Sequence, residues 1–322
     1  MAKAKFTDEE FKQLFVDLGP RGMAEKFGID RRNLQRRRRS IERKHHISIA
    51  ATQQKYNSYP VKRISEYPGW ASLEVKNGIV LVGSDAHIWP GPMSTAMRGF
   101  IHFAKLLKPK AVILNGDGLD FPRISRHAPI GWTHTPTVVD EIEAAQEQLG
   151  LLEQAAGKAV KLWPLGNHDA RYETRLATVA PEYAKLHGTS LQDFFPLWQP
   201  CWSVQINENI VVKHRFKGGI HATHNNVLWS GMSMVTGHLH SGKVVPFNDY
   251  TNDTKYGVDT GCLANVHSRA FLYNENNPVN WRSGFCVLTF IDGKLLQPEL
   301  VYVWEEKDKN GYIQFRGELI KV

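Results

Sequence analysis

The stretch Ile-Val-Leu-Val-Gly-Ser-Asp-Ala-His, residues 79–87, decides the fold of this chain. Four apolar, β-prone residues lead through a glycine and a serine into Asp85 and His87, two polar side chains that lie two positions apart. Residues two apart share one face of an extended segment. The pattern therefore predicts a buried strand that presents a carboxylate and an imidazole on one side at its carboxyl end.

Four further stretches repeat this arrangement of an apolar run that ends in aspartate, asparagine or histidine. They are residues 112–120 (VILNGDGLD), 162–169 (LWPLGNHD), 210–214 (IVVKH) and 234–240 (MVTGHLH). Helical patterns lie between the early strands, and strands dominate the second half, which favours a layered α/β sandwich with two central sheets. Open α/β sheets place their sites at the carboxyl ends of strands, so we expect these polar clusters to meet.

Two hairpins are also expected. Asn77-Gly78 lies between the apolar runs 73–75 and 79–82, and this dipeptide is typical of a tight hairpin turn. Near the carboxyl terminus, residues 301–304 and 312–315 have the composition of paired strands and predict a terminal hairpin.

The composition fits one large domain with a small appendage: the chain has 322 residues, 42% of them hydrophobic and 22% charged. No apolar run approaches the roughly 18 residues of a membrane span, and residues 1–13 lack the apolar core of a secretory signal. Three cysteines without a C-x-x-C pair argue against a disulfide scaffold and a thiolate zinc site. We therefore expect a cytoplasmic protein without a membrane partner.

The positive charge is confined to the amino-terminal fifth of the chain. The net charge is +8, and residues 1–70 hold 16 Lys and Arg against 8 Asp and Glu, whereas residues 71–322 hold 24 of each. A basic segment on a neutral body indicates that the segment itself has a polyanion as its partner.

Residues 1–46 are predicted to form a basic, helical module. Thr7 can cap a first helix, Gly19-Pro20 ends it, and a short second helix leads through a turn at Gly28 into a third helix from Arg31 to about Lys44. Counted from Pro20, the small, glycine and aliphatic places of the helix-turn-helix pattern are occupied by Ala24, Gly28 and Leu34. The segment therefore resembles a helix-turn-helix. We expect the third helix to contact phosphates, DNA rather than RNA, through Arg31, Arg32, Arg36, Arg37 and Arg39.

One departure from the helix-turn-helix pattern leaves the role of this module open. Arg37 occupies the eighteenth place of the helix-turn-helix pattern, which is usually apolar. A solvated basic helix without a specific partner is the alternative interpretation.

Residues 47–69 are polar, contain two prolines and are predicted to be a linker, which leaves residues 70–322 as the main domain.

The five motifs D-x-H, G-D-x-x-D, G-N-H-D, a strand-end histidine and G-H-x-H occur in this order over residues 78–265. Together they resemble the calcineurin-like metallophosphoesterase superfamily. The resemblance implies a four-layer α/β/β/α metallophosphoesterase sandwich, here preceded by the small helical module.

The resemblance also implies two divalent metal ions. Asp85, His87 and His240 would hold one ion, Asn167, His214 and His238 the other, and Asp117 would bridge them. Such ligands without a thiolate favour Mn²⁺, with Fe, Zn²⁺ or Mg²⁺ as alternatives. A metal-bridging hydroxide would be the nucleophile, while His168, oriented by Asp120, would protonate or steady the leaving oxygen.

Three assignments stay open in the sequence. The family has His-Gly where this chain has His214-Arg215, and His224 competes; we favour His214 because four β-prone residues precede it. His221 and His224 would contact substrate phosphate or lie in a solvated polar loop. Arg171 would clamp a phosphate or pair with an acidic neighbour, Glu173 or Asp169.

Phe121-Pro122 after the second motif and Asp169 after His168 differ from the protein-phosphatase pattern. Nucleases and small cyclic-nucleotide phosphodiesterases share the simpler pattern, and the basic module favours a nuclease delivered to DNA. Such compact combinations resemble bacteriophage or prophage proteins, which places the chain in a bacterial or phage-infected cell. The alternatives are a small-molecule phosphodiesterase or phosphatase, and a DNA-binding regulator with a non-catalytic metal fold. The sequence leaves the oligomeric state open.

Overall fold

The computed structural model describes residues 6–47, 49, 66–129, 131, 134–251, 253–307 and 310–322. The chain divides into two compact units, residues 1–62 and residues 63–322. Most of the predicted linker lies outside the described residues. Its described ends are packed: Ile49 lies in the core of the small unit, and Tyr67 packs against the core of the large unit.

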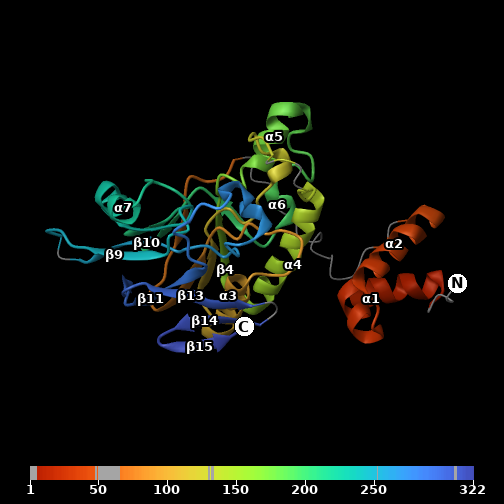
Figure 1. The fold of residues 1–322 in the computed structure, drawn as a ribbon, viewed down its shortest axis with the longest axis horizontal. Helices are drawn as coiled ribbons and strands as arrows, with labels where there is room; N and C mark the ends of the chain where they lie inside the picture. The colour runs from red at the N-terminus through yellow and green to blue at the C-terminus, as the bar shows by residue number, and fades with distance from the viewer. Residues whose placement is uncertain are drawn as a thin grey trace. The chain divides into compact units, whose positions relative to one another are not determined.

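The small unit consists of α1 (Asp8–Phe27) and α2 (Arg31–His45) (Figure 1). Thr7 and Glu10 form a reciprocal capping box at the start of α1. Gly19 has a φ of 66° and breaks α1 into two helical segments, as the Gly19-Pro20 pair predicts. Gly28 adopts the left-handed conformation at the end of α1, so the glycine at this place of the pattern makes the turn into α2.

Arg37 is half-buried and packs against another segment of the small unit. Its guanidinium lies 4.9 Å from the centroid of the Phe11 ring and donates to the carbonyl oxygen of Phe6. The long stem of arginine can cover apolar surface while its head finds a partner, so Arg37 fills a place that is usually apolar. Of the five arginines predicted to contact phosphates, the other four are exposed: Arg31, Arg32, Arg36 and Arg39.

The large unit contains two β-sheets. The nine-stranded sheet has the order β15-β14-β13-β11-β2-β3-β4-β5, with β12 paired to β11, and only its β2 to β5 pairs are parallel. Its strands are β2 (Gly78–Gly83), β3 (Ala111–Leu114), β4 (Val160–Pro164), β5 (Gln199–Cys201), β11 (Gly284–Ile291), β12 (Lys294–Leu295), β13 (Glu299–Lys307), β14 (Asn310–Phe315) and β15 (Glu318–Lys321). The pairing of β13 with β14 confirms the predicted terminal hairpin.

The six-stranded sheet has the order β1-β6-β7-β8-β10-β9. Its β7 pairs in parallel with β8, and β8 with β10, so the ends that carry the fourth and fifth motifs point the same way. Its strands are β1 (Ala71–Leu73), β6 (Val204–Ile206), β7 (Ile210–Val212), β8 (Ser233–Thr236), β9 (Lys243–Phe247) and β10 (Lys255–Asp259).

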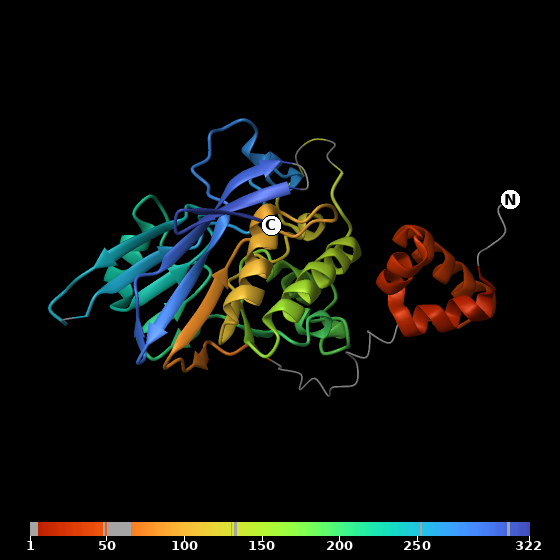
Figure 2. The ribbon, with the colours of Figure 1, turned by 90° about the horizontal axis from the view of Figure 1, so that it is seen from below.

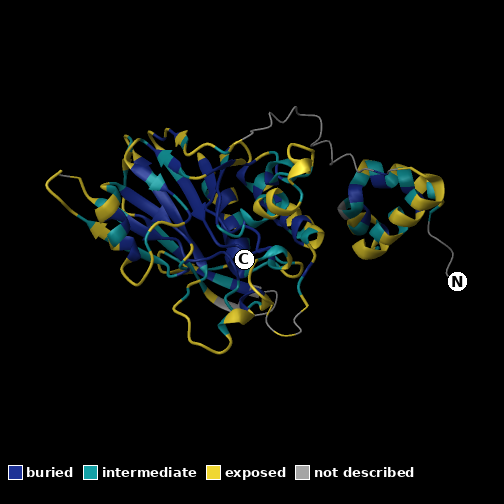
Figure 3. Ribbon diagram, turned by 90° about the horizontal axis from the view of Figure 1, so that it is seen from above, coloured by how far each residue is buried: buried dark blue, intermediate teal, exposed yellow. Residues whose placement is uncertain are grey.

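The sheets are stacked between helices and form four layers. α3 (Thr95–Leu107) and α4 (Val138–Ala156) share a core with the nine-stranded sheet (Figure 2), and α7 (Ala222–Ser230) packs on β8, β9 and β10. Val80 and Val82 face the apolar layer between the sheets, whereas Leu81 faces the helices, as the two-residue period of a strand requires. The strands form the buried middle of the unit (Figure 3), which confirms the predicted α/β/β/α sandwich.

The remaining helical segments are α5 (Arg171–Val179), α6 (Leu191–Phe194) and the 3-10 turns at Pro122–Ile124, Pro181–Tyr183 and Arg269–Asn274. Among the described residues, no helix combines the length and the apolar character needed to cross a bilayer.

The predicted hairpin at Asn77-Gly78 is wrong. β1 pairs with β6 in the six-stranded sheet, whereas β2 pairs with β3 and β11 in the nine-stranded sheet. The turn therefore connects the two sheets, because the apolar side chains before and after it both face the layer between them. Asn77 accepts a hydrogen bond of 2.9 Å from the backbone of Asp292 instead of closing a two-residue turn.

Candidate metal centre

Both sheets contribute side chains to one cluster. Asp85 and His87 follow β2, Asp117 follows β3 and Asn167 follows β4, all in the nine-stranded sheet. The six-stranded sheet supplies His214 after β7 and the pair His238 and His240 after β8. Each residue lies just beyond the carboxyl end of its strand, which is why the sequence pattern predicted them together.

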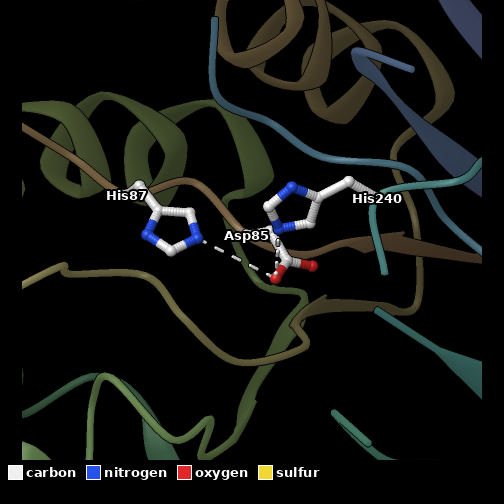
Figure 4. Close-up of side chains that lie close together, drawn as sticks. All are labelled: Asp85, His87 and His240. Atoms are coloured by element: carbon white, nitrogen blue, oxygen red, sulfur yellow. Dashed lines mark hydrogen bonds and ion pairs between the residues drawn. The ribbon is translucent and has the colours of Figure 1, made fainter. Parts of the chain in front are cut away.

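Asp85, His87 and His240 form the first group, and their nearest ligand atoms lie within 4.8 Å of one another (Figure 4). The Asp85 Oδ1 atom is 3.0 Å from Nε2 of His240 and 4.0 Å from Nε2 of His87. Burial alone would raise the pKa of Asp85, but the charges of His240 and His214 lower it to about 2. The carboxylate is therefore ionised and ready to hold a cation.

Asp117, His214 and His238 form the second group. The Nε2 atom of His214 lies 3.1 Å from Asp117 Oδ2 and 4.0 Å from Asp85 Oδ1, so it lies between two carboxylates. Burial lowers the pKa of His214, but Asp117 and Asp85 outweigh that effect and raise it to about 10. Two buried carboxylates thus stabilise a positive charge at this position, and a pair of divalent cations would provide that charge in the same way.

Four of the ligand candidates each keep one buried polar atom without a hydrogen-bond partner. Within the described part of the chain, eight buried side-chain polar atoms lack a hydrogen-bond partner, and four of them belong to the predicted ligands: His87 Nε2, Asn167 Oδ1, His214 Nε2 and His240 Nδ1. Buried polar atoms in native proteins are nearly always hydrogen-bonded, so a concentration of exceptions requires an explanation. Metal ions would supply the missing partners, and the residues present fit them.

The backbone of the ligand residues is left-handed at five positions. Asp85, His87, Asp117, His238 and His240 have φ values of 54°, 40°, 50°, 70° and 55°. Residues other than glycine seldom adopt this conformation, and they concentrate at functional sites. The strain is consistent with loops that are shaped to aim side chains at one point.

A glycine before three of the ligand motifs leaves no room for a side chain. A Cβ atom on Gly166 would lie 2.0 Å from Asp117 Oδ1, one on Gly116 would lie 2.4 Å from His214 Nδ1, and one on Gly237 would lie 2.5 Å from Asp85 Oδ2. The neighbouring strand-end loops can therefore approach closely only because these positions are glycine.

The Gly166→Ala substitution is expected to lower Mn²⁺ affinity by about 10- to 100-fold, because its methyl group displaces the Asp117 carboxylate. Isothermal titration of Mn²⁺ into the purified variant measures this loss. Gly150→Ala in α4 is the matched control, since its Cβ atom would meet nothing within 4 Å. Equal Mn²⁺ affinity in the two variants would contradict the close packing described here.

His168 and Asp120 lie beside the ligands. His168 Nδ1 is 2.6 Å from Asp120 Oδ1, so the carboxylate holds the imidazole as the sequence analysis expected. Burial lowers the pKa of His168, but its hydrogen bond to Asp120 and the charge of Asp117 outweigh burial and raise it. The Nε2 atom of His168 lies 3.9 Å from Asp117 Oδ2, and the ring therefore faces the ligand group.

Arg171 pairs with neither of the acidic residues considered for it. Its Nη1 donates to the carbonyl oxygen of Asp120 at 2.7 Å, and its Nη2 lies 3.2 Å from His168 Nε2. Glu173 instead accepts from Tyr67 and from the backbone of Leu191. Arg171 thus adds a fixed positive charge beside the ligand group and His168.

Asp169 has a structural role that the sequence did not indicate. This buried carboxylate accepts hydrogen bonds from five N–H groups: Asp117 N at 2.8 Å, Gly118 N at 2.9 Å, Leu119 N at 3.3 Å, Gly166 N at 2.9 Å and Trp163 Nε1 at 3.1 Å. It joins the loops after β3 and β4, which carry Asp117 and Asn167. The only signal in the sequence was its place at the end of the G-N-H-D motif.

An aromatic wall, formed by Phe271, Tyr273 and Trp281, was also missed. The Trp281 ring centroid lies 4.6 Å from that of His240, and the Phe271 centroid lies 5.1 Å from that of His87. Tyr273 contacts both Phe271 and Trp281 and remains 51% exposed. The wall comes from the long connection between β10 and β11, which has no periodic pattern that would have indicated it.

His221 and His224 lie outside the two ligand groups. His214 belongs to the second group, whereas His221 immediately precedes α7 and His224 lies within it, and both are exposed. His214 Nδ1 lies 2.8 Å from the carbonyl oxygen of Asn115, which leaves Nε2 to face the carboxylates. Among the described residues, His214 therefore lies in a group that could hold a metal ion, and His221 and His224 do not.

No protein-family model and no curated protein matches this chain. Among solved structures, it is similar to zinc-complexed Vps29 from Entamoeba histolytica, with 15% identity and a TM-score of 0.36 over 76% of this chain and 97% of that one. It is also similar to a serine/threonine phosphatase from Saccharomyces cerevisiae that resembles human PP5, with 12% identity and a TM-score of 0.36 over 76% and 87% of the two chains.

The large unit is a four-layer sandwich in which loops from both sheets bring together six side chains that could hold metal ions: Asp85, His87, His240, Asp117, His214 and His238.

Proposed function

We propose that this protein is a metal-dependent phosphoester hydrolase that acts on nucleic-acid phosphodiesters. The observation that carries the proposal is the convergence of two buried carboxylates with several imidazole groups, while Asn167 Oδ1 and three of the histidines each keep a buried polar atom without a hydrogen-bond partner in the described structure. Asp85, His87 and His240 would hold one divalent ion, and Asn167, His214 and His238 the other, with Asp117 between them.

Divalent cations at these ligands supply Lewis acidity toward a phosphoryl group and lower the pKa of water. The donor set contains no thiolate, which favours Mn²⁺ while leaving Fe, Zn²⁺ and Mg²⁺ as candidates. The protein itself supplies fixed geometry and a dry setting, because Asp85, Asp117 and His214 are almost completely buried.

In this proposal, His168 transfers the proton. Asp120 fixes its Nδ1 side, so Nε2 faces the ligand group and can hold a proton at the leaving oxygen. Arg171 places donors next to the same nitrogen, where they suit the negative charge of a phosphodiester. A regulator with a non-catalytic metal fold would have no need of this arrangement, which argues against that alternative.

The distribution of charge and the aromatic wall support the proposed substrate class. The amino-terminal fifth of the chain carries the whole positive excess, and four of its arginines lie at least partly exposed on α2. The wall sets Phe271 and Trp281 beside His87 and His240, and a nucleobase could stack on the half-buried Trp281 or the exposed Tyr273 next to the phosphodiester. The wall would also accept a cyclic nucleotide, so a small-molecule phosphodiesterase is the second candidate.

The direct test is hydrolysis by the purified full-length protein of single-stranded DNA, duplex DNA, RNA and cyclic nucleotides, before and after metal removal. The proposal expects cleavage of a polynucleotide that EDTA abolishes and Mn²⁺ restores. Faster turnover of cyclic nucleotides than of any polynucleotide would favour the second candidate. Absence of hydrolysis with every metal and substrate would overturn the proposed activity.

The small unit provides a second prediction. Replacing Arg32, Arg36 and Arg39 together by glutamine should weaken DNA binding and reduce the salt-dependence slope by about 1 for each phosphate that is no longer neutralised. Fluorescence anisotropy over a range of salt concentrations measures both effects. The control replaces three exposed lysines of the large unit, Lys76, Lys105 and Lys158, with the same change in charge. Identical salt slopes for the two triple variants would contradict a DNA-binding role for α2.

A further inference from the structure

The outer layer of the six-stranded sheet exposes apolar side chains around α7. Phe216, Ile220, Leu228 and Trp229 are 44%, 75%, 55% and 68% exposed. Together with Arg215 and Lys217 they form what we call the α7 patch. Single exposed apolar residues are common on protein surfaces, but a group with two aromatic rings is characteristic of a binding surface.

The two rings of the α7 patch share one cation. The Nζ atom of Lys217 lies 5.0 Å from the centroid of the Phe216 ring and 4.4 Å from the centroid of the Trp229 ring. The backbone N–H of Lys217 donates to Asn226 Oδ1 at 2.9 Å, which ties the loop to the middle of α7. The rings and the ammonium group are therefore held together as one surface.

The patch lies in a long acid-free part of the large unit. Residues 209–248 contain no Asp or Glu, yet they contain Lys213, Arg215, Lys217 and Lys243, although residues 71–322 as a whole carry equal numbers of acidic and basic residues. A purely apolar partner would leave these cations without counter-charge. A partner with both flat rings and negative charge would satisfy the whole surface.

The patch is also connected to the candidate metal centre. Arg215 directly follows the ligand His214, and Asn226 of α7 donates to Thr236 Oγ1, two residues before the ligand His238. α7 packs against β8 and β10, and Figure 1 shows it beside β9 and β10. A chain bound along α7 would therefore lie next to the loops that carry two of the ligands.

We propose that the α7 patch binds the single-stranded part of a nucleic-acid substrate, with bases stacked on Trp229 and Phe216 and phosphates beside Lys217 and Arg215; the inference rests on the proposed function. Stacking on aromatic rings with nearby basic groups is how proteins hold single strands without reading their sequence. A duplex keeps its bases inside the helix, so the patch favours single-stranded over double-stranded substrate.

The test compares Trp229→Ala, Trp229→Phe and Trp70→Ala in the full-length protein. Trp70 is 65% exposed in the same unit and is the matched control for removal of a surface tryptophan. Binding of a fluorescein-labelled oligothymidylate is measured by anisotropy in EDTA, where hydrolysis does not occur. The ratio of kcat/KM for this oligonucleotide to kcat/KM for bis(p-nitrophenyl) phosphate is then measured with Mn²⁺.

Trp229→Ala is expected to weaken oligothymidylate binding and to lower this ratio, each on the order of tenfold, because one base no longer stacks. Trp229→Phe should recover most of both values, and Trp70→Ala should match the wild type. Oligothymidylate binding that is equal in Trp229→Ala and Trp70→Ala overturns the inference. So does a Trp229-dependent attachment to phosphatidylserine vesicles, or a Trp229-dependent self-association, without an effect on oligothymidylate.

The outcomes also separate this inference from the proposed function. If the wild type hydrolyses no phosphodiester while Trp229→Ala still weakens oligothymidylate binding, the α7 patch stands and the enzymatic proposal fails. If the wild type cleaves DNA and Trp229→Ala binds it normally, the enzymatic proposal stands and the α7 patch is excluded.

Discussion

Asp117→Asn is expected to reduce hydrolysis by more than about 100-fold, because it removes a direct ligand and loss of an outer partner alone costs up to that much. Asp117 Oδ2 lies 3.1 Å from His214 Nε2, while its Oδ1 accepts from the backbone of His168 at 2.8 Å. Asparagine keeps the shape and can still accept from His168. It removes the negative charge that a divalent cation requires at this point. The loss is measured as kcat/KM for bis(p-nitrophenyl) phosphate with Mn²⁺, together with Mn²⁺ affinity by calorimetry.

His168→Gln distinguishes loss of metal from loss of proton transfer. His168 is not among the predicted ligands, so this variant should bind Mn²⁺ as the wild type does. Its turnover should nevertheless fall by about 10²- to 10⁴-fold, the usual contribution of a general acid. Wild-type Mn²⁺ affinity in Asp117→Asn, or weakened affinity in His168→Gln, would show that these two roles are assigned to the wrong residues.

Asp169→Asn is expected to destabilise the large unit by on the order of 3 kcal/mol, because buried N–H groups lose their charged acceptor. The wild-type carboxylate accepts from five N–H groups, four of them on the backbone of two loops and one on a tryptophan ring. An asparagine amide would turn an NH₂ group toward some of these donors. Urea denaturation monitored by circular dichroism measures the change in the free energy of unfolding.

Metal binding should weaken in the same Asp169→Asn variant, since Asp117 and Asn167 lie on the loops that Asp169 joins. The control is Asp140→Asn at the capping box of α4, where the same chemical change is exposed and should cost about 1 kcal/mol. If Asp169→Asn is no less stable than Asp140→Asn, the five hydrogen bonds contribute far less than their geometry implies.

The sequence predicted the parts of this fold that follow from local pattern. Residues 79–87 predicted a buried strand with a polar end, because Val80, Leu81 and Val82 place apolar side chains on both faces of that strand. The structure buries all three. The ligand candidates could be grouped because parallel strands bring their carboxyl ends to one edge. Their spacing in the sequence therefore carried information about their positions in space.

What the sequence could not predict depends on packing between distant segments. The Asn77-Gly78 turn has the composition of a hairpin, but the partners of β1 and β2 come from residues far along the chain. Trp281 lies in an unpatterned connection, and only the folded chain brings it to His240. Arg37 interrupts a helix pattern, and its contact with Phe11 in another helix explains why the unit tolerates it.

The origin of the ligands in two different sheets has a consequence for the physical state of the protein. Asp85, Asp117 and His87 belong to one sheet, and His214 and His240 to the other, so cations bound by all of them would cross-link the sandwich. At a free cation concentration one hundred times the dissociation constant, such binding raises the free energy of unfolding by about 2.7 kcal/mol. The melting temperature would then rise with the free metal concentration, and a chelator would lower the stability of the protein as well as abolish hydrolysis.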